Sequence, residues 1–297
     1  MMKSVMYHYV RPMDESGLDY LNLSQFRRQL DFFSKNGGIV TRDSWIDFKA
    51  GKNMEGHLLT FDDGLADHYK FVLPELIRRK LFAIFFVPTN PLESKSPLTV
   101  HLLHAALARV EWFPLLRNLI DITGINVTQL DNSTLESTYR LQNSPSMKKD
   151  IKRIVNYGRH TNLVRDKINE LLLKVLDTNE QEFCNLWYIN PSQCVELSDN
   201  GMSVESHSVS HRLLKNLSDE EVIYELQHSK EFLARLGLPV TEFCFPFGGT
   251  KSFSQHHKDF VARFYKLAHS VDPKPLHPNF VDLYEIPRYD CNRWLNV

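Results

Sequence analysis

The sequence predicts a parallel α/β fold. Short apolar runs typical of buried strands are repeatedly followed by helical patterns, as in a parallel sheet covered by helices. This alternation holds over residues 1–90 and 188–297 and stops between residues 91 and 187. The chain has 297 residues, enough for two domains of about 150 residues each, or for one barrel of up to about 250 residues with an insertion. Both organisations remain open at this point.

The first stretch of alternation begins with a strand and an amphipathic helix. Lys3–Tyr9 is predicted to be a strand. Ser24 is expected to cap a helix that carries Phe26 and Phe33 on its apolar face and ends at Gly37-Gly38. The elements expected next are a strand over Gly38–Val40, a helix over Asp43–Lys49, a strand over His57–Phe61, a helix over Leu65–Lys80 with a kink at Pro74, and a buried strand over Leu81–Val87.

Residues 91–187 are expected to form a helical insertion or subdomain, with helices over His101–Ile120 and Met147–Leu176. Strands and helices alternate again from residue 188. The elements expected there are a helix over Pro191–Asn200, a strand over Met202–Glu205, a helix to Leu236 that begins at the capping box Ser218–Glu221, a strand over Thr241–Phe245, a helix over Ser252–Arg263 and a strand over Tyr265–Ser270.

The composition excludes several classes of protein. The chain has 35 Lys and Arg against 36 Asp and Glu, which removes the general electrostatic basis for binding nucleic acid, so no such partner is expected. The longest apolar run, Leu81–Pro88, is far shorter than the ~20 residues of a membrane-spanning helix. The N-terminal segment lacks the apolar core of a signal peptide, so we expect a cytoplasmic protein. The four cysteines have no CxxC spacing and are interpreted as reduced thiols.

One segment departs from this balance of charge. Residues 148–167 carry seven Lys or Arg against two Asp. The first interpretation is a solvated helix face. The alternatives are contact with a phosphate-bearing substrate or with an anionic membrane surface.

Polar side chains follow four of the predicted strands at the points where the strands end. Asp62-Asp63-Gly64 follows one strand and Ser206–His211 follows another. The first strand ends in Tyr7-His8-Tyr9, and Pro246–Gly249 follows Thr241–Phe245. In a barrel of parallel strands these ends share one rim, where the active sites of such enzymes lie.

His207 and His211 are four residues apart, so a helical turn would place both imidazoles on one side. Together with one carboxylate, they would form a set of three protein ligands of the kind found in catalytic zinc sites. Taken alone, the pair is more typical of two surface histidines than of metal ligands, and Asp62-Asp63 is equally typical of a solvated turn or a helix cap. His101 and His104 have no acidic third ligand in their own segment and are interpreted as residues on a helix surface.

The motifs resemble those of the polysaccharide deacetylases of carbohydrate esterase family 4. Thr60–Gly64 is identical to the TFDDG motif of that family, and His207–His211 matches its H-[ST]-x-x-H motif. The resemblance covers residues 1–90 and 188–297 and leaves the insertion unexplained. It implies a distorted (β/α) TIM-like barrel in which Asp63, His207 and His211 hold a divalent metal and Asp62 is the general base. Zinc is the expected metal, and cobalt, nickel or iron would fit the same ligands.

The third motif departs from the usual family pattern. The family has an Arg two residues before the Pro of this motif, which orients the base, whereas this chain has Cys244 there. That form resembles the poly-N-acetylglucosamine deacetylase branch. Arg288 is either a substitute for the missing Arg or a plain structural or surface residue. The backbone N–H of Phe247 remains available as a donor to an oxyanion.

The chain has no match to the Leu-x-His motif that supplies the acid of the family near its C-terminus. The poly-N-acetylglucosamine branch is circularly permuted, and Tyr7-His8-Tyr9 resembles its N-terminal signature, which makes His8 the candidate acid. The resemblance thus implies a metal-dependent N-deacetylase that acts on an N-acetylated carbohydrate in lipopolysaccharide or capsule biosynthesis. The alternatives are a hydrolase of another amide, such as a formamide on a sugar precursor, and a non-catalytic carbohydrate-binding protein.

Overall fold

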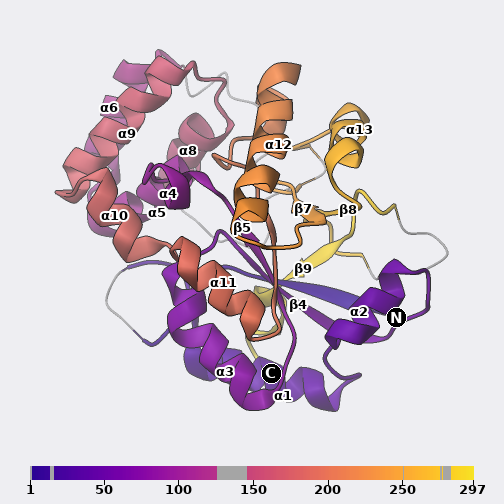
Figure 1. Cartoon of the computed structure of the whole chain (residues 1–297). Coiled ribbons are helices and arrows are strands. Elements are labelled where there is room, and N and C mark those ends of the chain that lie inside the picture. The colour runs from indigo at the N-terminus through magenta and orange to yellow at the C-terminus, as the bar shows by residue number, and fades with distance from the viewer. Residues whose placement is uncertain (1, 14–16, 126–145, 250, 275, 277–281) are drawn as a thin grey trace.

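The computed structural model of the chain describes residues 2–13, 17–125, 146–249, 251–274, 276 and 282–297. Seven parallel strands form one sheet in the order β8-β7-β6-β5-β4-β1-β9 (Figure 1). Their bounds are β1 Met2–Tyr7, β4 Gly56–Asp62, β5 Ile84–Val87, β6 Ser203–Ser206, β7 Glu242–Cys244, β8 Leu267–His269 and β9 Arg288–Asp290. A parallel bridge from His269 to Ile286 links β8 to the segment before β9. The sheet therefore nearly closes, which confirms the predicted distorted barrel.

The two faces of the sheet belong to different hydrophobic clusters, because successive side chains of a strand point in opposite directions. On the face covered by α1 (Leu23–Lys35), the rings of Tyr7, Phe61 and Phe85 stack in a row with centroids 5.0 and 4.9 Å apart. On the opposite face, Phe86 packs in a second cluster together with Ile286. Both faces are apolar, so the continuous hydrophobic runs of these strands are the expected sequence pattern.

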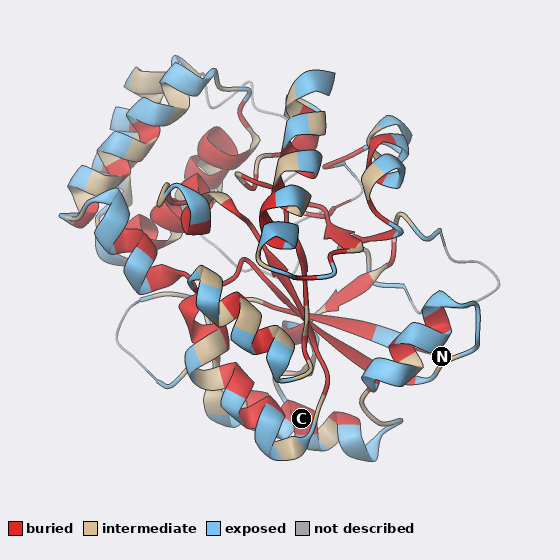
Figure 2. Ribbon diagram, in the orientation of Figure 1, coloured by how far each residue is buried: buried red, intermediate tan, exposed pale blue. Residues whose placement is uncertain are grey.

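Helices cover the outside of the barrel, each with a buried and an exposed side (Figure 2). Their bounds are α1 Leu23–Lys35, α2 Arg42–Lys49, α3 Leu73–Arg79, α4 Asn90–Glu93, α11 Pro191–Asp199, α12 Asp219–Arg235 and α13 Gln255–Phe264. The capping box of Ser218 and Glu221 at the start of α12 is confirmed. The expected cap at Ser24 is wrong: Asn22 accepts a hydrogen bond from the Gln25 N–H and starts α1 two residues earlier.

The described residues between 91 and 187 form helices around a hydrophobic cluster of their own, with Tyr9 and Phe247 of the barrel packed against it. The helices are α5 Thr99–Arg109, α6 Trp112–Thr123, α8 Ser146–Lys152, α9 Asn162–Leu176 and α10 Glu180–Trp187. The continuous helix expected over His101–Ile120 is two helices, because the backbone is extended at Val110 and Glu111. A π-helical turn, Arg153–Tyr157, follows α8 and precedes α9.

The shortest strands differ most from the sequence prediction. The strand expected over Gly38–Val40 is reduced to a single bridge between Ile39 and His57. Strand β9 and the two-residue pair β2 (Val10–Arg11) and β3 (Leu21–Asn22) were not predicted, because so few residues carry no recognisable periodicity.

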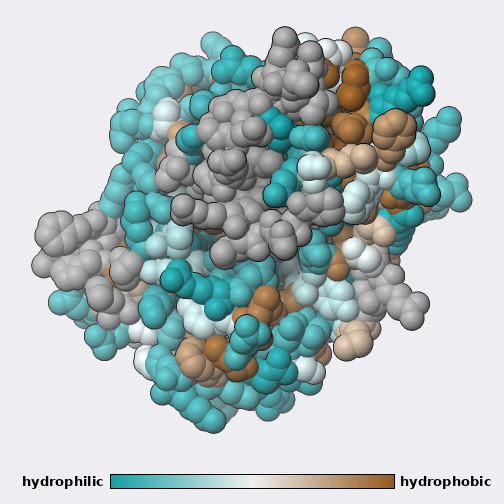
Figure 3. All heavy atoms as spheres, turned by 180° about the vertical axis from the view of Figure 1, so that it is seen from behind, coloured by the Kyte–Doolittle hydropathy of each residue, from teal (hydrophilic) through white to brown (hydrophobic). Residues whose placement is uncertain are grey.

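The surface of the molecule is mostly hydrophilic where the view from behind shows described residues (Figure 3). In the part of the chain that the structure describes, no helix combines the length and the apolar character needed to cross a bilayer.

Candidate active site

The two adjacent aspartates at the end of β4 point to different partners. Asp62 is the last residue of the strand, and Asp63 follows with a φ of +80°. Gly64 also has a positive φ, and a Cβ there would lie 3.0 Å from a methyl carbon of Val87, so the turn requires glycine. Both aspartates are buried: Asp62 is 2% exposed and Asp63 is 4% exposed. The turn thus separates two carboxylates that the sequence places side by side.

Asp63 lies beside both histidines of the HSVSH segment. Its Oδ1 atom is 3.5 Å from the Nε2 atom of His207 and 3.4 Å from that of His211. One ligand atom from each of the three residues falls within 4.8 Å of the others. The sequence-predicted metal ligands are therefore brought together in space.

A loop, rather than a helical turn, brings the two histidines together. Strand β6 ends at Ser206, and Ser208 and His211 have φ values of +66° and +54°, so the segment does not form the helical turn that a spacing of four residues would allow. Glu225 on α12 holds the loop by accepting hydrogen bonds from the backbone N–H groups of Val209 and Ser210, at 2.8 and 2.9 Å.

The donor set fits a divalent cation. The Nδ1 atom of His207 donates to the Cys244 carbonyl at 2.8 Å, which in the neutral imidazole leaves a lone pair on Nε2, facing Asp63. Burial lowers the pKa of His211 to about 3, so this imidazole is neutral, the form that binds metals. Asp63 Oδ1 is buried and has no hydrogen-bond partner among the described residues. Three electron-pair donors therefore face one another, as they would around a cation.

The pKa of His207 also indicates that the surroundings of its imidazole favour positive charge. Burial lowers it, but the contacts with Cys244 and Asp63 outweigh burial and raise the pKa well above its ordinary value. Positive charge is therefore favoured at this point of the site, whether a proton or a metal ion carries it.

Asp62 is bound by Arg288 on β9. The two guanidinium NH groups of Arg288 donate to the two carboxylate oxygens of Asp62 at 2.6 and 2.7 Å. Arg288 is fully buried and also donates to the Thr60 hydroxyl at 3.1 Å and to the Ser270 carbonyl at 3.1 Å. A surface role for Arg288 is therefore wrong. Its guanidinium also lies 2.9 Å from the sulfur of Cys244, the residue that replaces the usual motif Arg.

The guanidinium sets the charge of Asp62. Burial alone would raise the pKa of this carboxyl group, but Arg288 overrides burial and lowers the pKa to about 2. Asp62 is thus ionised at every pH near neutrality, in one fixed orientation.

The other two predicted site residues lie beside this centre. The Nε2 atom of His8 is 3.9 Å from Asp63 Oδ2, and 39% of the His8 side chain is exposed. The ring of Phe247 contacts the ring of His211, with centroids 4.8 Å apart, and its backbone has a φ of +62°. The Phe247 N–H donates no hydrogen bond to any described residue.

His101 was expected on a helix surface, and this expectation is wrong. The residue is 1% exposed, and its Nε2 atom lies 3.1 Å from Asp63 Oδ2. Its Nδ1 atom is 2.7 Å from the Tyr188 hydroxyl. His104 is half-buried and bonds the hydroxyl of Tyr9 at 3.1 Å. Helix α5 is buried on nearly all sides, and the apolar character of Val100–Leu107 on every side was the signal available in the sequence.

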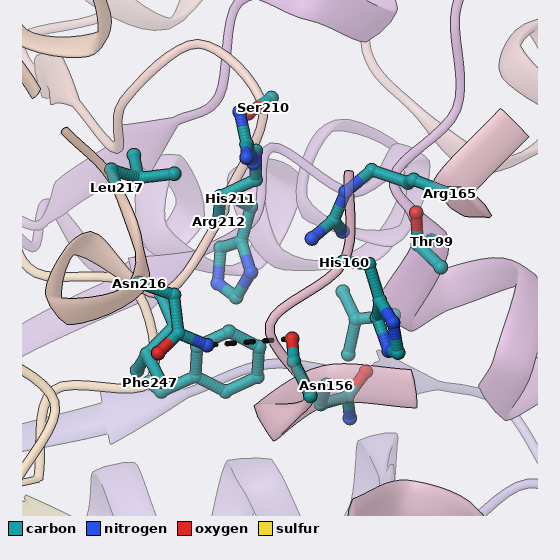
Figure 4. A pocket seen from close by; sticks show the side chains of 13 residues that line it. Thr99, Asn156, His160, Arg165, Ser210, His211, Arg212, Asn216, Leu217 and Phe247 are labelled. Atoms are coloured by element: carbon teal, nitrogen blue, oxygen red, sulfur yellow. Dashed lines mark hydrogen bonds between the residues drawn. The ribbon is translucent and has the colours of Figure 1, made fainter. Parts of the chain in front are cut away.

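A hollow beside the cluster of Asp63, His207 and His211 lies between the barrel and the insertion (Figure 4). His211 and Phe247 form one wall, and His160 and Arg165 from the insertion form the opposite wall. Arg165 belongs to the basic run 148–167, within which Lys152 and Arg153 are 3% and 6% exposed. The interpretation of the whole run as a solvated face is therefore wrong.

Comparisons with known proteins find solved structures with a similar fold. Among solved structures, the chain resembles Streptococcus pyogenes deacetylase PplD in complex with acetate (TM-score 0.61, 16% identity, covering 97% of this chain and 91% of that one). It also resembles IcaB from Ammonifex degensii (TM-score 0.57, 16% identity, covering 99% of this chain and 93% of that one). A third similar structure is the BpsB deacetylase domain from Bordetella bronchiseptica (TM-score 0.54, 15% identity, covering 97% of this chain and 95% of that one). These likenesses show the fold.

A search of curated proteins finds no match to this sequence. The family model described as polysaccharide deacetylase matches residues 52–261, which include the aspartate pair and both histidines of the HSVSH segment. Since this match spans most of the sequence, the chain belongs to the polysaccharide deacetylase family.

Proposed function

We propose that the chain is a metal-dependent carbohydrate N-deacetylase, which hydrolyses an N-acetyl group and releases acetate. The observation that carries the proposal is the pair of neighbouring carboxylates with separate partners. Asp63 faces two histidines through an oxygen without a hydrogen-bond partner among the described residues, while Asp62 is held by Arg288. A site that only holds a metal has no need for the second, ionised carboxylate.

In this proposal Asp63, His207 and His211 hold a divalent ion, with zinc as the first expectation. When bound, such an ion polarises the amide carbonyl and acidifies nearby water, which a carboxylate with the low pKa of Asp62 needs in order to act as a base. Arg288 fixes the orientation of Asp62 and takes the place of the motif Arg that Cys244 replaces.

Phe247 and His8 complete the proposed chemistry. The N–H of Phe247, which has no hydrogen-bond partner among the described residues, donates to the oxyanion that forms when water adds to the carbonyl. His8 protonates the leaving amine, a role that suits a partly exposed imidazole next to the carboxylate cluster. Cytoplasmic localisation, lipopolysaccharide or capsule biosynthesis and membrane contact through residues 148–167 stay predictions from the sequence.

The test combines metal analysis with an acetate assay on a panel of N-acetyl sugars. We expect purified protein to contain a divalent ion and to release acetate. Asp62→Asn should keep the ion and lose at least about a hundredfold in rate, as for loss of a general base, whereas His207→Ala should lose both ion and activity. Lys167→Gln, on the exposed side of α9, is the control that should change neither.

The alternatives give different results in the same assay. Release of formate from N-formyl sugars without acetate from N-acetyl sugars would identify a deformylase. Binding of sugars with no release of either acid would identify a non-catalytic protein. Full activity in metal-free protein would contradict the proposal.

A further inference from the structure

Two arginines of the hollow beside the proposed site take no part in the chemistry described above. Arg165 comes from α9 of the insertion, and Arg212 directly follows His211. Both line the hollow, together with His211 and Phe247. In Figure 4 the guanidinium of Arg165 points into the space that faces the His211 ring. The hollow thus carries positive charge next to the residues proposed to hold the metal.

Each of the two arginines has one buried donor, the Nε–H group, with no partner in the part of the chain that the structure describes. The Nε atoms of Arg165 and Arg212 are buried, and neither has a hydrogen-bond partner among the described residues. A buried donor that is left unpaired costs free energy, and an acceptor group of a bound ligand would remove that cost. The two guanidinium groups are also close enough to affect each other: burial lowers the pKa of Arg165 to about 10, and the charge of Arg212 contributes to this lowering. With this pKa, Arg165 remains charged at neutral pH.

The nearby carboxylates do not neutralise Arg165 by a direct contact. Glu221 accepts from Arg212 at 2.9 Å and from the Ser218 N–H at the cap of α12. Glu225 is occupied by the backbone of the HSVSH loop. Among the described residues, no carboxylate bonds the side chain of Arg165, so its fork is available to a ligand.

We propose that Arg165 and Arg212 form a subsite for an oxyanion, a phosphate or carboxylate group carried by the N-acetylated sugar. The proposal rests on the proposed deacetylase function and narrows its substrate to acidic N-acetyl sugars. Planar guanidinium groups bind both oxyanions through paired hydrogen bonds. Because the hollow shares His211 and Phe247 with the proposed catalytic centre, one sugar can reach the subsite and the centre together.

The binding test uses sugars that cannot be deacetylated, so that it does not depend on turnover. We would titrate the full-length, metal-loaded protein with glucose, glucose 1-phosphate and glucuronate. At least one of the two anionic sugars should bind about tenfold or more tightly than glucose, as one good charge-assisted contact provides. The tighter of the two identifies the oxyanion as phosphate or carboxylate.

Three variants show whether Arg165 is responsible. Arg165→Gln should abolish the preference for the anionic sugar, and Arg165→Lys should keep part of it, because lysine retains the charge but not the fork. Lys167→Gln removes a charge from the exposed side of the same helix and should keep the full preference. Equal binding of all three sugars by the unaltered protein, or an equal loss in Lys167→Gln, would overturn the proposal.

An activity measurement separates this proposal from the proposed function. Acetate release from N-acetylglucosamine 1-phosphate or N-acetylglucosaminuronate should exceed release from N-acetylglucosamine in kcat/KM, and Arg165→Gln should remove the difference mainly through KM. If no N-acetyl sugar releases acetate but the anionic preference in binding depends on Arg165, the deacetylase function fails and the subsite stands. If acetate is released but the anionic sugars bind no more tightly than glucose, the deacetylase function stands and the subsite fails.

Discussion

The paired hydrogen bonds between Arg288 and Asp62 join two fully desolvated charges inside the barrel. A buried ion pair of this kind contributes less to stability than its short distances suggest, because both ions lose their hydration. Removal of one partner is nevertheless strongly destabilising, because the other partner is then left as an uncompensated buried charge. Arg288 therefore acts on Asp62 in two ways, by keeping it ionised and by fixing its orientation.

Substitution of Arg288 should consequently affect both stability and pH dependence. Arg288→Met should lower the free energy of unfolding by about 3–5 kcal/mol, measured by urea denaturation. In Arg288→Lys, which keeps the charge but not the fork, the pKa of Asp62 should rise from about 2, since burial then meets a weaker opposing effect. The acid limb of acetate release should therefore move to higher pH.

The exposed Arg293, five residues further along, provides the control. Arg293→Lys should change neither the urea midpoint nor the acid limb. If Arg288→Lys is equally silent in both measurements, Arg288 does not control Asp62.

At the scale of elements, helix α5 links the insertion to the carboxylate that the barrel supplies. His101 contacts Asp63 Oδ2 at 3.1 Å and is itself bonded by the Tyr188 hydroxyl at 2.7 Å. Its contact leaves Asp63 Oδ1 to face His207 and His211. The insertion thus positions Asp63, a proposed metal ligand, through His101, a residue that lies outside the TFDDG and HSVSH motifs of the barrel.

Removal of this contact should weaken metal binding. His101→Ala should raise the metal dissociation constant by about 10–100-fold, the usual effect of losing a residue that orients a ligand, as measured by chelator competition. His104→Ala alters the same helix one turn later, where the side chain bonds Tyr9 instead, and should leave the affinity within about twofold, as for a residue outside the ligand set. The same loss in both variants would show that the helix matters only for folding.

The elements also show why part of the site could be predicted from the sequence. TFDDG and HSVSH are contiguous motifs at the ends of strong strands, so their convergence followed from the barrel geometry alone. Arg288 lies on a three-residue strand after a proline, too short to be recognised, and its pairing with Asp62 spans 226 positions. The apolar character of Val100–Leu107 indicated that His101 is buried, but its contact with Asp63, between the insertion and the barrel, leaves no local pattern. The loop at His211 was misread because a spacing of four residues does not reveal a positive φ.

At the scale of the whole molecule, the proposed metal ligands lie on segments that come together only in the folded barrel. Asp63 follows β4 and His207 follows β6, with β5 between these strands in the sheet. The insertion reaches the same point through His101. An ion held there would bridge parts of the chain more than a hundred residues apart, and the unfolded chain would not reproduce the site.

A ligand that binds the folded state alone raises stability by mass action, so metal should raise the melting temperature. At a free metal concentration of about one hundred times the dissociation constant the gain is about 2.7 kcal/mol, which corresponds to a rise of roughly 4 °C for a chain of this length. Differential scanning calorimetry with and without zinc measures it. His207→Ala should show no rise in melting temperature, because the two remaining donors, Asp63 and His211, do not hold the ion on their own. An equal rise in the variant would mean that zinc stabilises the fold somewhere other than between β4 and β6, and the ligand assignment would then be wrong even if the enzyme released acetate.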